Sequence, residues 1–230
     1  MKIKRVQIKN IPVIIWGDDS DKAYIFVHGK MSNKESAEPF AEIAAERGYQ
    51  TISFDLPEHG QRSDAAYKCD IFNGIADLEE IAGYAFDKWD KLSLYGCSLG
   101  AFFSLCAFEK RKFERSLFQS PIVNMEYLIH KMFEWFGVTE EALQEKLEIE
   151  TPVDVLSWRY YQYVRSHPVK NWSSPTRILY AGKDRLQSRA VIKEFADKFA
   201  CELEISENSD HPFMDEGDKK IIEEWLKKNI

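Results

Sequence analysis

The chain has 230 residues, of which 44% are hydrophobic and 30% charged, and its 38 acidic against 31 basic side chains give a formal net charge of −7. This length can bury one core without disulfides or metal, and the composition is typical of a single globular domain. The acidic balance argues against a nucleic-acid partner, because phosphate binding needs a concentrated basic face. Residues 1–10 interleave charged with apolar side chains, so we expect neither a signal peptide nor a membrane segment, and a cytoplasmic location.

The cysteines give no sign of a metal site or a disulfide framework. Cys69, Cys97, Cys106 and Cys201 form no CxxC pair and no cluster with histidines at metal-ligand spacing. We therefore expect reduced, mostly buried thiols, and no metal or cofactor.

Strands and helices alternate along the chain. The predicted strands are residues 6–8, 12–16, 23–27, 51–54, 92–95, 116–118, 177–180 and 202–205. The predicted helices of the core are one that follows Ser32-Asn33 and runs through Phe40, Ile43 and Ala44 to Gly48, and those of residues 75–86, 99–108, 190–199 and 219–228. This alternation predicts an α/β fold, with a mostly parallel central sheet, helices on both faces and the first two strands added antiparallel at one edge.

An excursion of roughly fifty residues, far longer than an ordinary connection, separates strands 116–118 and 177–180. Apolar residues recur there at helical spacing from Met125 to Phe136, and Thr151 followed by Pro152 predicts the start of a second helix. We interpret Ile122–Trp172 as a helical cap inserted into one domain that spans residues 1–230.

The segment Gly96-Cys97-Ser98-Leu99-Gly100 follows a predicted strand and precedes an apolar helix. A serine on such a sharp turn is exposed as a nucleophile, and the free N–H groups at the helix start can stabilise an oxyanion beside it. The competing interpretation is a chance occurrence of the pattern in a turn. We expect Ser98 to be the nucleophile and Cys97 to serve packing.

A serine nucleophile needs a base, and position selects among the five histidines, His28, His59, His130, His167 and His211. Only His211 follows the last predicted strand, on a loop that can return to the same sheet edge as Ser98. The alternative is a histidine of an ordinary surface loop.

Asp184 follows strand 177–180 and is the preferred partner for the histidine. Asp210 is its rival, but neighbouring side chains in an extended loop point in different directions, so Asp210 would face away from His211. Asp184 could otherwise be a turn or helix-capping residue.

A second loop, His28-Gly29-Lys30, follows the buried strand 23–27 and would pass close to the nucleophile. The backbone N–H groups of Lys30 and Leu99 are the expected oxyanion donors, with Met31 as a fallback. His28, Gly29 and Met31 are also expected next to the substrate, although His28 taken alone is more typical of a structural histidine.

With these residues in place, the chain resembles the α/β-hydrolase superfamily over nearly its whole length. The order Ser98, Asp184, His211 matches the order of the family's triad. Residues 54–64, Phe-Asp-Leu-Pro-Glu-His-Gly-Gln-Arg-Ser-Asp, are similar to the family's Asp-x-Pro-Gly-His-Gly-x-Ser turn, but Glu58 stands where the family usually has glycine. A helical cap after the sixth core strand is also common in the family, whereas the missing His-Gly-Gly-Gly form argues against the hormone-sensitive-lipase branch.

The resemblance implies a carboxylesterase-like serine hydrolase that acts on a small-molecule acyl substrate through an acyl-enzyme. Leu128 and Met132 of the insertion would line a mainly apolar pocket, which favours uncharged substrates. Thioesters, amides of short peptides and C–C bonds beside a carbonyl remain alternatives, as do acyl transfer to another acceptor and a non-catalytic binding role.

Overall fold

The computed structural model describes residues 1–63 and 66–230. Its strands are β1 (Ile3–Ile8), β2 (Ile11–Trp16), β3 (Lys22–Val27), β4 (Gln50–Phe54), β5 (Lys91–Cys97), β6 (Ser116–Gln119), β7 (Glu148–Glu150), β8 (Val155–Ser157), β9 (Thr176–Ala181) and β10 (Glu202–Ser206). Its α-helices are α1 (Glu38–Glu46), α2 (Ile71–Lys88), α3 (Leu99–Ala107), α4 (Met125–Phe136), α5 (Glu140–Lys146), α6 (Trp158–Ser166), α7 (Arg189–Phe199) and α8 (Glu216–Asn229). The core elements predicted from the sequence are confirmed.

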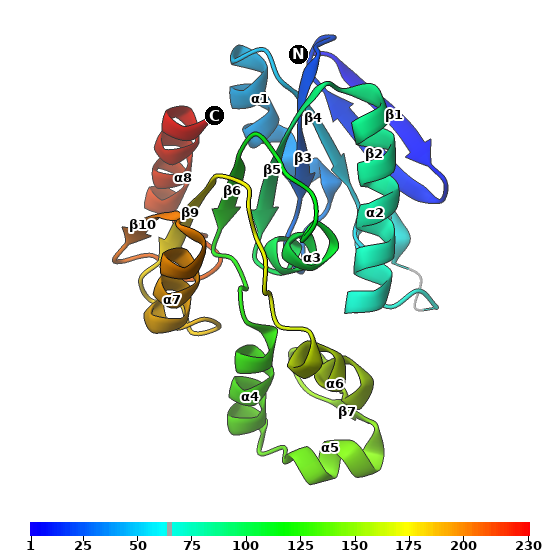
Figure 1. Cartoon of the computed structure of the whole chain (residues 1–230), viewed down its shortest axis with the longest axis vertical. Coiled ribbons are helices and arrows are strands. Elements are labelled where there is room, and N and C mark those ends of the chain that lie inside the picture. Colours follow the sequence, from blue (N-terminus) through cyan, green and yellow to red (C-terminus); the bar gives the residue numbers. More distant parts are fainter. Residues whose placement is uncertain (64–65) are drawn as a thin grey trace.

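One sheet in the order β1-β2-β4-β3-β5-β6-β9-β10 forms the centre of the molecule (Figure 1). Within this sheet β4, β3, β5, β6, β9 and β10 run parallel to one another. The opening hairpin is antiparallel, as expected, because β1 pairs antiparallel with β2 and β2 with β4. Because β3, β5, β6 and β9 are parallel, the loops that follow β3, β5 and β9 all lie at the same carboxyl edge of the sheet.

Successive side chains of the strands pack into two apolar layers, one on each face of the sheet. In β3, Ala23, Ile25 and Val27 pack against the side covered by α2, α3 and α7, while Tyr24 and Phe26 pack against α1 and α8. This period of two is what a sheet with helices on both faces requires. The strands that carry the candidate site are therefore packed on both faces.

The excursion between β6 and β9 holds α4, α5, the β7–β8 hairpin and α6, and lies beyond the carboxyl ends of β5 and β6 (Figure 1). The expected helix start at Thr151 is wrong. Thr151 Oγ1 accepts the N–H groups of Val153 and Asp154, which closes the turn between β7 and β8. A threonine that caps a helix accepts N–H groups in the same way, so the local signal is shared by both structures. The next helix, α6, begins at Trp158 after Ser157.

No helix within residues 1–63 and 66–230 is long and apolar enough to cross a membrane.

Candidate active site

Ser98 stands between β5 and α3 in a conformation that side chains rarely adopt, with φ 49° and ψ −115°. Glycines on either side let the surrounding backbone close around it. A Cβ on Gly100 would lie 2.3 Å from the His28 carbonyl oxygen, and one on Gly96 would lie 2.9 Å from the Ala101 Cα. Such strain at a polar residue is typical of functional sites, because the turn holds the side chain out from the backbone.

His211 and Asp184 complete a continuous hydrogen-bonded chain with this serine. Ser98 Oγ lies 2.8 Å from His211 Nε2, and His211 Nδ1 lies 2.7 Å from Asp184 Oδ2. The carboxylate is fully buried and can only accept, so Nδ1 carries the proton and Nε2 presents its lone pair to the serine hydroxyl. The rival Asp210 is exposed.

Cys97, directly before the serine, is a poor nucleophile. Burial raises the pKa of its thiol to about 12, so the reactive thiolate is scarce at neutral pH. The structure thus agrees with a packing role for Cys97.

Two backbone N–H groups next to the serine have no acceptor within the described part of the chain. Leu99 is the first residue of α3, where intrahelical acceptors are lacking, and Lys30 lies in the loop after β3. Gly29 of that loop is close to Ser98, since a Cβ built on it would be 3.3 Å from the Ser98 Cβ. The expected donors thus border the same space.

Two histidines hold the loop after β3 in place. His28 Nδ1–H donates to the Gly29 carbonyl (2.7 Å), and the Leu56 N–H donates to His28 Nε2 (3.1 Å). Burial lowers the pKa of His28 to about 4, so the ring is neutral. The Met31 N–H donates to His59 Nε2 (3.0 Å).

These contacts differ from two expectations. Both ring nitrogens of His28 are engaged within the protein, so the ring has no free polar atom for a substrate and serves as a structural residue. Met31 has its N–H taken by His59 and its side chain 93% exposed, so it supplies neither an oxyanion donor nor a pocket wall. The sequence indicated a turn at residues 54–64, but not that Leu56 and His59 of this second loop, residues 55–62, would contact His28 and Met31.

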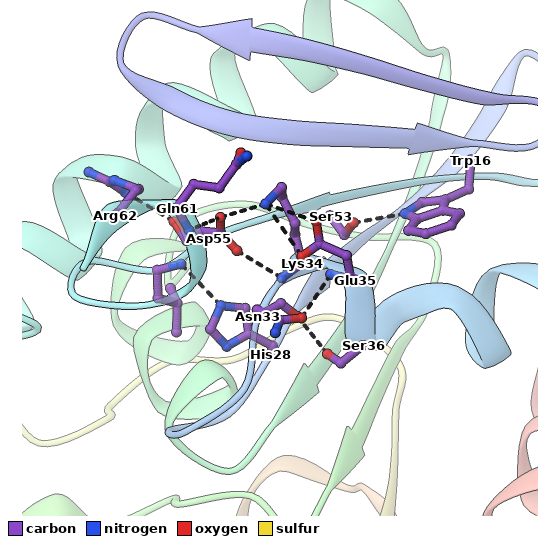
Figure 2. A network of polar contacts seen from close by, with 11 residues as sticks. Trp16, His28, Asn33, Lys34, Glu35, Ser36, Ser53, Asp55, Gln61 and Arg62 are labelled. Carbon is purple, nitrogen blue, oxygen red and sulfur yellow. Dashed lines mark hydrogen bonds and ion pairs between the residues drawn. The ribbon is translucent and has the colours of Figure 1, made fainter.

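That second loop is organised around the buried Asp55 (Figure 2). Its carboxylate accepts the Lys34 ammonium (2.7 Å), the Lys34 N–H (2.9 Å) and the Gln61 N–H (3.0 Å). Arg62 donates to the Asp55 carbonyl (3.0 Å) and pairs with Asp77 of α2. The ion pair between Lys34 and Asp55 therefore joins the segment after β3 to the loop after β4.

Glu58, the departure from the family pattern, adopts φ 60°, the region where glycine is preferred. Its carboxylate accepts the Cys69 N–H (2.6 Å) and pairs with Lys68 (3.2 Å), contacts that a glycine could not make. Asp64, the last residue of the predicted motif, lies outside the described residues.

The insertion contacts the loop after β3 through an ion pair between Lys30 and Asp154 of the β7–β8 turn. Leu128 and Met132 lie one turn apart on α4; Met132 is buried and Leu128 half-buried in the apolar cluster that continues into the core. A cavity of about 210 Å³ separates α4 and the end of α6 from α7, with Phe102 in its wall. Neither Leu128 nor Met132 lines that cavity, and their role in substrate binding stays a prediction.

No family model matches the sequence, and no curated protein matches it either. Solved structures do resemble it. Est1E from Butyrivibrio proteoclasticus, with ferulic acid bound, superimposes with a TM-score of 0.79 at 17% identity, covering 98% of this chain and 96% of that chain. Mouse alpha/beta hydrolase domain-containing protein 10 gives 0.76 at 16% identity over 99% and 98%. The thioesterase domain from the curacin biosynthetic pathway gives 0.64 at 14% identity over 98% of both chains. The chain therefore has the α/β-hydrolase fold.

Proposed function

We propose that the protein is a serine hydrolase in which Ser98 attacks a carbonyl carbon, His211 removes the serine proton and Asp184 orients the histidine. The observation that carries this proposal is the unbroken series of contacts from Ser98 Oγ through the imidazole to the buried carboxylate. A serine hydroxyl is a weak nucleophile unless a base accepts its proton, and this geometry supplies that base.

The reaction proceeds by two acyl transfers. Attack of Ser98 Oγ on the carbonyl forms a tetrahedral oxyanion, which the N–H groups of Leu99 and Lys30 stabilise. The imidazolium of His211 gives its proton to the leaving group, and the C–O bond to that group breaks to leave an acyl-enzyme. A water molecule, deprotonated by the same imidazole, then releases the acid and regenerates Ser98.

A small, mainly apolar carboxylic ester is the proposed substrate. Its acyl chain would lie against Leu128 and Met132 on α4, apolar residues of an insertion that contacts the loop of Lys30. Est1E, whose structure holds ferulic acid, is a solved neighbour of the same fold. A thioester is the alternative, since a thioesterase domain also shares the fold.

The compartment proposed for this activity is the cytoplasm. All four cysteines are unpaired, as reduced thiols would be in a reducing environment.

Labelling with a fluorophosphonate tests the nucleophile directly, because the probe bonds covalently only to an activated serine. Wild type should be labelled and should hydrolyse p-nitrophenyl esters, with a preferred acyl length when acetate, butyrate and octanoate are compared. Ser98→Ala should lose labelling and lower kcat by roughly 10⁴-fold or more, while Cys97→Ala should retain both. Retained hydrolysis in Ser98→Ala, or its loss only in Cys97→Ala, would refute the assignment.

A further inference from the structure

Gln187 lies three residues after Asp184, and its side chain is fully buried between the loop of the acid and the beginning of the insertion. Its Oε1 accepts the N–H groups of Val123 (3.1 Å) and Asn124 (2.9 Å), and its Nε2 donates to the carbonyls of Asn124 (3.0 Å) and Leu186 (2.8 Å). A primary amide has two donor hydrogens and two acceptor lone pairs, so every hydrogen-bonding position of this side chain is used.

These partners also fix which way the amide points. Rotating the amide by half a turn would aim its NH₂ group at the N–H groups of Val123 and Asn124, and its oxygen at two carbonyl oxygens. The side chain therefore occupies a single orientation, and the two segments it joins have a single spacing.

The backbone of Gln187 belongs to the loop that carries the acid. Its N–H donates to Asp184 Oδ1 (3.2 Å), beside the N–H of Leu186 (2.7 Å), and its carbonyl accepts the Tyr180 hydroxyl (2.9 Å). Asp184 Oδ1, the carboxylate oxygen that does not contact His211, is thus hydrogen-bonded to Gln187, whose side chain also binds the insertion.

The segment of the insertion that Gln187 binds also contacts Ser98. Ile122, directly before Val123, donates its N–H to the Ser98 carbonyl (3.2 Å). Asn124 in turn accepts the Tyr127 N–H and starts α4. The segment 122–124 consequently contacts the Ser98 turn, the acid loop and the first helix of the insertion within three residues.

We propose that Gln187 is a positioning residue that sets the Asp184 carboxylate against His211 by clamping the acid loop to the first junction of the insertion. The proposal rests on the function proposed above. It makes the beginning of the insertion part of the support of the triad, in addition to any contact that the insertion makes with substrate.

The test replaces Gln187 by methionine, which has a similar length and volume but makes none of the four side-chain hydrogen bonds. Gln50→Met is the matched control, because Gln50 is also buried and its amide bonds Trp89 and Gly17 at the opposite end of the strands. With p-nitrophenyl acetate, Gln187→Met should lower kcat by roughly ten- to hundredfold with little change in KM. Gln50→Met should lower Tm while leaving kcat near wild type.

A second readout needs no substrate. The proton shared between His211 Nδ1 and Asp184 should give a far-downfield ¹H resonance in wild type, absent in His211→Gln. It should shift or broaden in Gln187→Met and stay unchanged in Gln50→Met. An unchanged resonance and kcat in folded Gln187→Met, or equal losses in both variants, would overturn the proposal. Wild type that shows the resonance but hydrolyses no ester and resists fluorophosphonate would instead refute the proposed function.

Discussion

Replacing Asp184 by asparagine should disable the site by reversing one hydrogen bond. Asp184 Oδ1 accepts two backbone N–H groups, those of Leu186 and Gln187, so the amide oxygen of the variant must take that position. The amide NH₂ group then faces His211 Nδ1, which has to accept instead of donate. The imidazole proton moves to Nε2, where it points at Ser98 and the lone pair that should receive the serine proton is gone.

The expected cost follows from this tautomer change and from the buried position of the carboxylate, whose side chain is 0% exposed. The variant loses both the correct tautomer and the negative charge that stabilises the imidazolium. Loss of these two contributions in a Ser-His-Asp site lowers kcat by about 10⁴-fold, which corresponds to ~5.5 kcal/mol of transition-state stabilisation. Because asparagine has the same shape and keeps both accepted N–H bonds, the fold should persist.

The assay is the hydrolysis of p-nitrophenyl acetate at neutral pH, with Asp210→Asn as the matched control. Asp210 adjoins His211 in sequence but is exposed, so its loss should change kcat less than about twofold, as is usual for a surface substitution without a catalytic contact. Thermal unfolding verifies that both variants are folded. Near-normal activity in Asp184→Asn, with a large loss in Asp210→Asn, would refute the reasoning and transfer the role of the acid to Asp210.

Two further predictions concern the loop after β3. Lys34→Met should lower the free energy of unfolding by about 3–5 kcal/mol, because it leaves the carboxylate of Asp55 buried without its cation. The control, Lys9→Met at an exposed ion pair, should lower it by under about 1 kcal/mol. Equal losses of the two variants in urea unfolding would contradict this account. The folded pKa of His28, about 4, lies below its ordinary value of 6.5, so the unfolded chain binds the extra proton and stability should fall by up to ~3 kcal/mol as the pH drops from 6.5 to 4. Urea unfolding between these pH values should show a shallower decline in His28→Gln, and an identical decline would assign the loss to other groups.

The fold could be predicted from the sequence because each core element carries its own periodic signal. In β3, buried side chains alternate between two apolar layers, and in α2 the apolar residues recur at helical spacing. The places of Ser98 and Asp184 follow from the same reasoning, since parallel strands bring the loops after β5 and β9 to one edge. These positions depend on local patterns and on topology, both of which sequence analysis can address.

Contacts between loops carry no such signal. Gln187 stands in a polar stretch that resembles any surface turn, and three of the four hydrogen bonds of its side chain join backbone groups 63 or 64 residues away. The ion pair between Lys34 and Asp55 likewise joins residues 21 positions apart with no shared periodicity. The turn at Thr151 shows the opposite difficulty, because its local signal is present but fits two different structures.

The candidate site is supported from two sides, the loop after β4 and the insertion. The oxyanion loop is tied to the loop after β4 by His28, His59 and the pair between Lys34 and Asp55, all of which are buried and lie outside the insertion. Under the proposal made above, the acid loop depends on the insertion through Gln187. Movement of the insertion would then disturb the orientation of His211, and it would also break the ion pair between Lys30 and Asp154, whereas the oxyanion loop would keep its contacts with the loop after β4. Attack by the serine needs both groups, so a displaced insertion would slow acyl transfer even when the carbonyl oxygen is correctly bound.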